Sequence, residues 1–452
     1  MQRKIYSQMS EWKDSDNRKP LMIFGPRQVG KTYSAISFAR KAFKNHVLFN
    51  FQESRELWKI FDRNLDPKRL VKELSAYSQE SIDEDTLLIF DEIQECDGAI
   101  TSLKYFAEDI PSQPIISTGS LLGLITGSAK DSDRDGTRNP SFPVGKVKEL
   151  HMHPMDLEEY AWATGRKELS DSIRMHFSDM SEMPLHDSAM DMYREYLAVG
   201  GMPEVVSSYV RTGSPDIVRT AQKGLDDSLI GDISKHAGSS DTVVRTLRAW
   251  NSMVSQLMKD NLKFQYSKIV KGARSSEYST SIDWLTAARV VNRCSMVTEP
   301  TPPLAGFTDT SAFRLFMSDT GLLSSKAEVP FKTIVSGRAS DRFRGVMAEN
   351  YVCQSLTAND MSAYYWNPDQ NTELDFLFQD SDGEVVPIEV KSGDRTTSKS
   401  LAKFRKTYSP RSSIRLSSKN FGREDDLYSI PLYAAFCIDK GWADKVREDR
   451  TE

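Results

Sequence analysis

Short apolar runs alternate with amphipathic helical patterns over the first third of the chain. Runs of four or five apolar residues are typical of strands buried on both faces of a parallel sheet. Such runs lie at residues 21–24 (LMIF) and 87–90 (LLIF), a third strand is expected at 114–118 (PIIST), and 47–51 (VLFNF) and 147–150 (VKEL) are additional strand candidates. The pattern predicts an α/β fold, a parallel sheet with helices on both faces that binds ligands at the carboxyl ends of its strands.

The middle of the chain has helical periodicity instead. Residues 164–189 are polar and are expected to connect domains. Helices followed by a β-ribbon resemble a winged helix, a module that binds DNA in some proteins and only other proteins in others. The helices are expected near residues 190–201, 215–237, 243–258 and 281–291, and the ribbon strands near 291–300 and 313–319.

The last quarter of the chain predicts a smaller mixed domain. A helix is expected over residues 341–356. Two strands, 373–378 (ELDFLF) and 385–391 (VVPIEVK), flank an Asp-Ser-Asp-Gly turn and predict a β-hairpin.

The first apolar run leads into GPRQVGKT, which matches G-x-x-x-x-G-K-[ST] between a strand and a helix. In that context Gly25 and Gly30 let the backbone wrap around phosphate oxygens. Lys31 reaches the β- and γ-phosphates, Thr32 ligates Mg²⁺, and the helix over 31–43 directs its positive end at the same anion. A chance match in a structural loop is the alternative. The residues predicted to bind the nucleotide, ATP, are Gly25, Pro26, Arg27, Gln28, Val29, Gly30, Lys31, Thr32 and Tyr33.

The run at 87–90 ends in two adjacent carboxylates. Asp91 is placed to hold Mg²⁺, and Glu92 is placed to polarise an attacking water as a general base. A strand that ends in solvated acids is the simpler interpretation, but the upstream loop favours the catalytic one. Thr118 or Ser120, after the next strand, could contact the γ-phosphate, although both residue types also cap helices. The sequence identifies no arginine finger.

A second group of acids lies in the last quarter. Residues alternate faces along a strand, so Glu389 and Lys391 project from one face and Asp375 on the partner strand can lie beside them. Asp375 and Glu389 could hold a divalent cation, and Lys391 could stabilise charge on a scissile phosphate. Glu349, on the helix predicted upstream, is the candidate third carboxylate. An E-x-K on a strand is common, and such folds are also reused for binding alone, so cleavage stays open.

Between Lys391 and Asn420 the sequence has nine Lys or Arg and one acid, Asp394, with Phe404 and Tyr408 interleaved. On a chain of net charge −5, such a run suits a nucleic-acid backbone. The alternative is a solvated helix face.

The composition of the chain argues against a membrane protein, a zinc-binding protein and a disulfide-stabilised protein. The hydrophobic fraction of 39% and the charged fraction of 27% are typical of soluble globular proteins, and 452 residues exceed one ordinary domain. No apolar run approaches the roughly 18 residues that a membrane helix needs, so no membrane contact and a cytoplasmic location are expected. The four cysteines are too scattered to indicate a zinc site or disulfides.

The polar composition of residues 126–141 predicts a loop. This loop either moves with the nucleotide state or only connects two elements.

Together, these motifs resemble bacterial and archaeal AAA-type ATPases that carry a C-terminal domain of unknown function with a PD-(D/E)XK nuclease-like, restriction-endonuclease-like fold. One departure is Lys146, where family members often have arginine; lysine keeps the charge but not the bidentate fork. The matching stretches are GPRQVGKT (25–32), LLIFDEIQ (87–94), STGSLLGL (117–124), LHMHPMDLEEY (150–160), EYLAVGGMPEVV (195–206), FMSDTGLL (316–323), GVMAENYV (345–352), TELDFLF (372–378) and PIEVKSG (387–393).

The predicted function is an ATPase that binds and hydrolyses ATP with Mg²⁺ and whose nucleotide state controls a DNA-binding, nuclease-like domain. A Mg²⁺-dependent DNA nuclease gated by ATP and a nucleotide-switched protein-binding regulator with little turnover are the alternatives. AAA-type ATPases often form rings, so monomer, dimer and larger homo-oligomer all stay open. The predicted domains are an AAA-type P-loop ATPase domain (1–163), a helical lid or connector (164–238), a winged-helix-like domain (239–330) and a nuclease-like domain (331–452).

Overall fold

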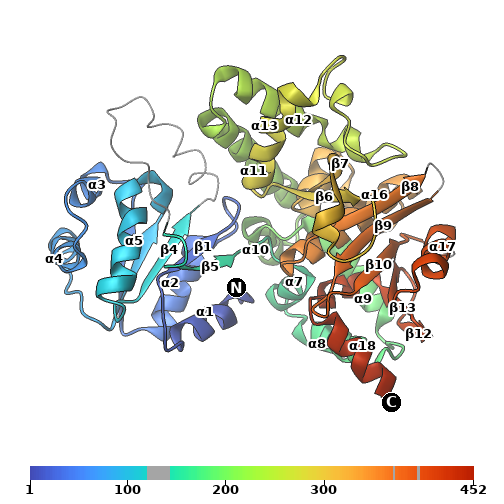
Figure 1. Ribbon diagram of the computed structural model, residues 1–452, viewed down its shortest axis with the longest axis horizontal. Helices are drawn as coiled ribbons and strands as arrows, with labels where there is room; N and C mark the ends of the chain where they lie inside the picture. Colours follow the sequence, from blue (N-terminus) through green and yellow to red (C-terminus); the bar gives the residue numbers. More distant parts are fainter. Residues whose placement is uncertain (120–142, 370–371, 394–397, 452) are drawn as a thin grey trace. The chain divides into compact units, whose positions relative to one another are not determined.

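The computed structural model describes residues 1–119, 143–369, 372–393 and 398–451. They form two compact units, residues 2–153 and residues 154–452, which are described separately (Figure 1).

The N-terminal unit is built on a five-stranded, fully parallel sheet with the order β2-β3-β4-β1-β5. The α/β fold expected from the apolar runs is therefore confirmed. Its strands are β1 (Leu21–Phe24), β2 (Asn45–Asn50), β3 (Thr86–Asp91), β4 (Ile115–Gly119) and β5 (Lys148–His151). Its described helices are α1 (Ile5–Lys13), α2 (Lys31–Ala42), α3 (Arg55–Phe61), α4 (Pro67–Ser78), α5 (Asp97–Asp109) and the short 3₁₀ helix η1 (Ile93–Glu95).

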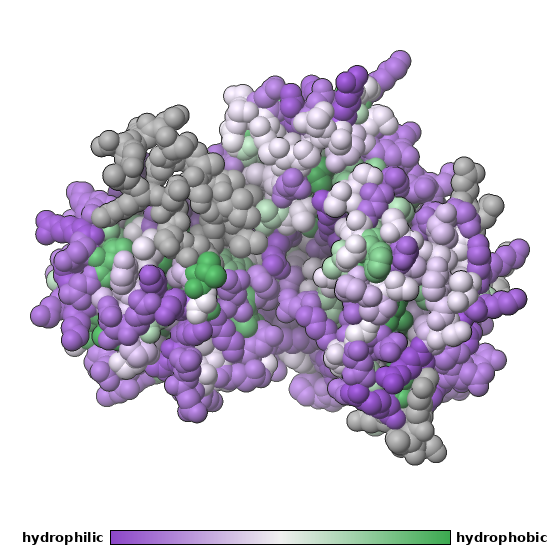
Figure 2. All heavy atoms as spheres, viewed as in Figure 1, coloured by the Kyte–Doolittle hydropathy of each residue, from purple (hydrophilic) through white to green (hydrophobic). Residues whose placement is uncertain are grey.

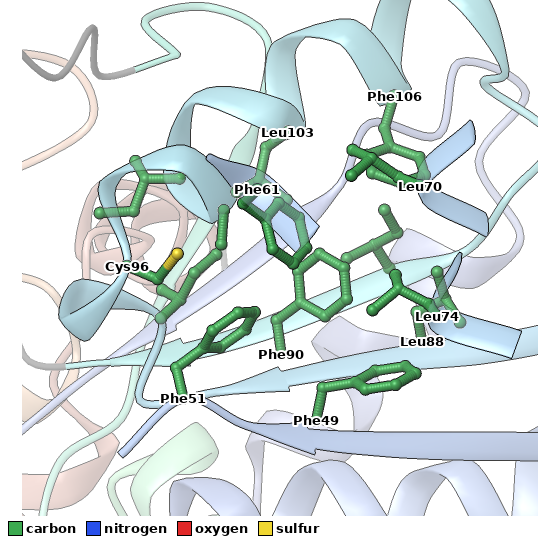
Figure 3. Close-up of a cluster of buried hydrophobic side chains, with 14 of the residues drawn as sticks. Phe49, Phe51, Phe61, Leu70, Leu74, Leu88, Phe90, Cys96, Leu103 and Phe106 are labelled. Atoms are coloured by element: carbon green, nitrogen blue, oxygen red, sulfur yellow. The ribbon is translucent and has the colours of Figure 1, made fainter. Parts of the chain in front are cut away.

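Two apolar layers hold this sheet, one on each face, because strand residues alternate sides. On one face Leu87 and Ile89 of β3 pack in the layer formed with α1 and α2. On the other, Leu88 and Phe90 pack with α3, α4 and α5. Figure 3 shows the second layer, in which the Phe90 ring meets the Phe51 ring edge to face at 5.6 Å. Phe90 directly precedes Asp91, so this core fixes the strand end that carries the predicted catalytic acids.

The C-terminal unit contains a mixed eight-stranded sheet with the order β12-β13-β11-β10-β9-β8-β6-β7. Its strands are β6 (Val291–Val297), β7 (Thr308–Met317), β8 (Tyr364–Asp369), β9 (Thr372–Gln379), β10 (Val385–Val390), β11 (Ser413–Ser417), β12 (Gly422–Glu424) and β13 (Leu427–Pro431). Its helices are α7 (Leu157–Ala163), α8 (Lys167–Asp179), α9 (His186–Val199), α10 (Pro203–Thr212), α11 (Pro215–His236), α12 (Ser240–Leu257), α13 (Ser275–Ala287), α14 (Thr320–Lys326), α15 (Phe331–Val335), α16 (Asp341–Ala358), α17 (Lys399–Tyr408) and α18 (Trp442–Thr451), with 3₁₀ helices η2 (Tyr266–Lys268), η3 (Leu304–Phe307) and η4 (Leu432–Cys437).

The ribbon predicted for a winged helix is part of this larger sheet. Strands β6 and β7 pair antiparallel, as expected, but β6 also pairs in parallel with β8. The predicted division between 239–330 and 331–452 therefore runs through one continuous sheet. Local strand patterns could not reveal this, because the β6–β8 pairing joins residues about seventy positions apart. The predicted connector at 164–189 differs too, since it contains α8, which buries Ser170 and Ile173.

A buried joint links the helices of this unit to its sheet. Asp319, 1% exposed, accepts hydrogen bonds from the Gly201 nitrogen at 2.6 Å and the Leu322 nitrogen at 2.9 Å. Gly200 has a φ of +83°, and a Cβ there would lie 2.3 Å from the Asp319 carboxylate. Burial raises the pKa of Asp319 to about 6. The GGMP and SDTG motifs are thus two halves of one packing contact.

Across the described ranges, no helix has both the length and the hydrophobicity that a bilayer crossing demands. On the face drawn in Figure 2, hydrophilic residues dominate and apolar ones form small separate groups.

Candidate nucleotide site and C-terminal acid cluster

The predicted phosphate-binding loop connects β1 to α2. Lys31, 6% exposed, folds across the loop and donates to the backbone oxygens of Gly25 and Pro26, each at 3.0 Å. Gly30 takes a φ of +94° directly before the helix. A Cβ on Gly25 would lie 2.3 Å from the Met152 oxygen, so the close approach of β5 requires glycine there.

The other loop residues differ in exposure. Pro26 and Val29 are buried, Arg27 is partly exposed, and Gln28 is exposed with a φ of +61°. Tyr33 is 60% exposed, on the first turn of α2.

A buried arginine that the sequence did not single out supports this loop. Arg3 Nη1 donates to the Val29 oxygen at 3.0 Å and Nη2 donates to the His153 oxygen at 2.6 Å. Its side chain therefore ties the loop to the chain that follows β5. No local motif marks Arg3, because it lies 26 residues from the carbonyl that it holds.

The carboxyl ends of β2, β3 and β4 and the amino end of α2 meet at Asp91, which is 4% exposed. Thr32 Oγ1 donates to Asp91 Oδ1 at 2.7 Å, and Asn50 Nδ2 donates to Oδ2 at 3.4 Å. Thr118 Oγ1 also donates to Oδ1. The structure thus brings Thr32, Asp91 and Thr118 together, and it adds Asn50, which the sequence analysis missed. Ser120, the other predicted sensor, lies outside the described residues.

Glu92 sits at the same edge in a left-handed backbone conformation, with a φ of +52°. Its side chain is partly exposed, and Gln94 Nε2 donates to Glu92 Oε2. Gln94 therefore fixes one oxygen of the predicted base. Lys146, the departure from the family pattern, pairs with Glu108 at 2.9 Å through half-exposed side chains, and a role in nucleotide sensing remains a prediction.

The C-terminal acids also gather at one place. Continuing the β9–β10 register by one residue from the Ile388–Phe376 pair sets Glu389 opposite Asp375. Lys391 Nζ contacts Glu389 Oε1 at 2.5 Å, and Asp375 Oδ2 accepts from the Val390 nitrogen at 2.7 Å.

Helix α16 brings the third predicted acid to this cluster. Asn350 anchors the helix to β7 by accepting from the Met317 nitrogen at 2.8 Å and donating to the Met317 oxygen at 2.9 Å. This fixes Glu349 beside Arg314, with 3.5 Å between Glu349 Oε2 and Arg314 Nη1. Burial, and then repulsion from Asp375, raise the pKa of both Glu349 and Glu389.

Arg314 is the member of this cluster that the sequence analysis did not foresee. It is fully buried on β7, pairs with Glu349 and Glu373, and donates from Nη1 to the Asp375 oxygen at 3.3 Å. Its guanidinium carbon lies 4.3 Å from the centre of the Tyr365 ring. A single arginine within FRLFM carries no local signal for this, because its partners come from α16 and β9.

The predicted metal ligands Asp375 and Glu389 each have one oxygen with a partner from the protein itself. Of the carboxylates and other metal-ligating side chains that the structure describes, no three are grouped so as to hold an ion. Arg314, Lys391 and a backbone nitrogen each face one carboxylate oxygen of the cluster. Metal binding by Asp375 and Glu389 therefore stays a prediction.

The basic run after β10 is more neutral than its sequence suggests. Lys403 pairs with Asp369 at 2.9 Å, Arg411 pairs with Asp382 at 3.1 Å, and Arg405 forms a two-bond pair with Asp426. The interleaved aromatics serve packing. Phe404 is buried and Tyr408 lies edge on to Trp366 at 5.5 Å. Asp394 lies outside the described residues.

Comparison with known proteins divides the chain into three segments. A model described as "AAA domain" matches residues 17–161. Two models described as domains of unknown function match residues 190–332 (DUF8612) and 344–434 (DUF4143). A search of curated proteins found no match.

Some solved structures resemble this chain, at low sequence identity. A Walker-type ATPase of Pyrococcus abyssi is 14% identical, with 72% of this chain and 95% of that chain covered and a TM-score of 0.41. The RuvB Holliday junction branch migration motor of Thermotoga maritima is 14% identical, with coverages of 64% and 87% and a TM-score of 0.28. These TM-scores carry no weight beside the loop geometry and the domain match. The chain therefore has an AAA-type P-loop domain over residues 17–161, followed by segments that match domains of unknown function.

Proposed function

We propose that the N-terminal unit binds ATP with Mg²⁺ and hydrolyses it. The observation that carries the proposal is the grouping of Lys31, Thr32 and Asp91 at one edge of the sheet. The ammonium of Lys31 donates to two loop carbonyls, and triphosphate oxygens would accept charge-assisted bonds in their place. The backbone of the loop and the start of α2 supply further donors for the phosphates.

The residues at Asp91 suit a magnesium ion that arrives with the nucleotide. Thr32 and Asp91 offer a hydroxyl and a carboxylate 2.7 Å apart, the hard oxygen ligands that this cation takes beside phosphates. Bound there, the ion would neutralise charge on the phosphate oxygens. Asn50 and Thr118 orient the carboxylate without adding charge.

Glu92 is the proposed general base. Its partly exposed carboxylate lies one residue beyond Asp91, and Gln94 holds one of its oxygens, which leaves the other to accept a proton from water.

Calorimetry of the full chain with ATP, ADP and Mg²⁺ tests the binding step. We expect saturable uptake that Lys31→Ala abolishes. Lys41→Ala, at the exposed end of the same helix, is the matched control and should bind as wild type does. A folded protein that takes up neither nucleotide at millimolar concentration would overturn the proposal.

We further propose that the nucleotide state alters what the C-terminal unit binds, with DNA as the first partner to test. Exposed Lys399, Lys406 and Lys419 support contact with phosphates. DNA binding followed by fluorescence anisotropy should differ between ADP and a slowly hydrolysed ATP analogue, and equal affinities would end the coupling proposal. Light scattering under the same conditions reports any nucleotide-dependent homo-oligomer.

An ATP-gated nuclease is the alternative that a second assay addresses. DNA incubated with Mg²⁺ or Mn²⁺ should be cut by wild type and left intact by Asp375→Ala if the acids are catalytic. If neither protein cuts DNA, the role as a nucleotide-controlled binding protein is favoured.

A further inference from the structure

The C-terminal acid cluster, which consists of Glu349, Asp375 and Glu389, lies against a buried cation, Arg314. The guanidinium of Arg314 is 0% exposed, and its partners are the carboxylates of Glu349 and Glu373 and the backbone oxygen of Asp375. Each partner comes from α16 or β9, so the side chain bridges the helix and the strand that hold the acids.

Two further oxygens of the cluster have partners as well. Asp375 Oδ2 accepts from the Val390 nitrogen at 2.7 Å, and Glu389 Oε1 pairs with Lys391 at 2.5 Å. Glu389 Oε2 and Glu349 Oε2 are buried oxygens that accept no hydrogen bond, and Glu349 Oε2 faces Arg314 Nη1 at 3.5 Å. Two such oxygens, one of them facing a guanidinium, are a poor substitute for the several oxygen ligands that a divalent ion requires.

We infer that Arg314 is the resident counter-ion of this cluster and takes the place of a catalytic divalent metal, so that the C-terminal unit engages its partner without cleaving it. This inference does not depend on ATP binding by the other unit. It concerns only the choice between a hydrolytic site and a binding site in the C-terminal sheet.

The physical reason is competition for the same carboxylates. A buried guanidinium is stable only when its charge is paired, so Glu349 and Glu373 cannot turn away from it at low cost. A divalent ion on Glu349 Oε2 would also face the guanidinium nitrogen that lies 3.5 Å from that oxygen. Lys391, at Glu389, adds a second positive charge on the other side.

Manganese binding without nucleotide tests the inference, with electron paramagnetic resonance counting free and bound ion. We expect wild type to have no saturable site that depends on Asp375 up to about 1 mM Mn²⁺, the weak end of protein cation sites. Arg314→Met should gain one bound ion per chain, and the added Asp375→Asn change should remove it. Arg293→Met is the matched control, because Arg293 lies on the neighbouring strand over the Phe313 ring and should leave binding as in wild type.

Two outcomes would overturn the inference. One is Mn²⁺ uptake by wild type that Asp375→Asn abolishes. The other is a folded Arg314→Met protein that binds no more Mn²⁺ than wild type does. If Arg314→Met does not fold, the comparison of wild type with Asp375→Asn still decides the question, and uptake that Asp375→Asn leaves unchanged belongs elsewhere and supports the inference.

Discussion

Replacing Glu92 by glutamine should stop ATP turnover while leaving ATP binding nearly intact. The amide cannot accept the proton of the attacking water, and a positioned general base contributes about 10²- to 10⁴-fold in rate. At about 1.4 kcal/mol per tenfold, this corresponds to roughly 3–5 kcal/mol of activation free energy. Glutamine has the shape of glutamate, so the neighbouring strand end should be undisturbed. Phosphate release measured at saturating ATP gives kcat, and calorimetry gives the affinity.

Two further variants show whether ATP hydrolysis depends on the position of the Glu92 carboxylate or only on negative charge nearby. Gln94→Ala removes the amide that holds Glu92 Oε2, so we expect a smaller fall, roughly tenfold, the value of about one hydrogen bond to a charged group. Glu95→Gln removes a neighbouring carboxylate in the same short helix and should leave kcat unchanged. If Glu92→Gln hydrolyses ATP at the wild-type rate, Glu92 is not the base and the mechanism proposed for this edge of the sheet is wrong.

Three other changes test the surroundings of the two sites. Gly25→Ala places a methyl group 2.3 Å from the Met152 oxygen, so the loop must shift, and calorimetry should find ATP affinity lowered by tenfold or more. Thr118→Val removes a hydroxyl donor from Asp91 and should lower kcat by about tenfold, with unchanged thermal stability as the check on folding. Asp319 has a folded-state pKa of about 6, above its ordinary 3.8, so its contribution to stability is full below pH 4 and is lost as pH rises through 6. Relative to Asp319→Asn, wild type should therefore lose at most about 3 kcal/mol between pH 4 and 7, measured by urea unfolding, and parallel pH profiles would contradict this.

The N-terminal sheet was predictable because its information is local. The buried strand at 21–24 and the phosphate-binding motif at 25–32 together span a dozen residues. The motif carries the residues that the structure places at the carboxyl edge of the sheet. Arg3 and Asn50 were not predictable, since each acts on a group brought near only by the fold. The C-terminal sheet shows the same limit, because the pairing of β6 with β8 depends on a long excursion through α14, α15 and α16.

The two acid sites differ in what surrounds the carboxylates, and this difference separates their chemistry. Asp91 accepts hydrogen bonds only from neutral side chains, those of Thr32, Asn50 and Thr118, among the contacts described above. Its negative charge therefore stays available to a cation that enters with a nucleotide. Cations pair with Glu349 and Glu389 at the C-terminal site instead, and Arg314 is fully buried beside them. Both sites contain acids on strands of a sheet, which is why sequence patterns suggested a metal at both. Only the fold shows which charges are already balanced, and this balance favours nucleotide-linked metal binding at the first site and metal-free recognition at the second.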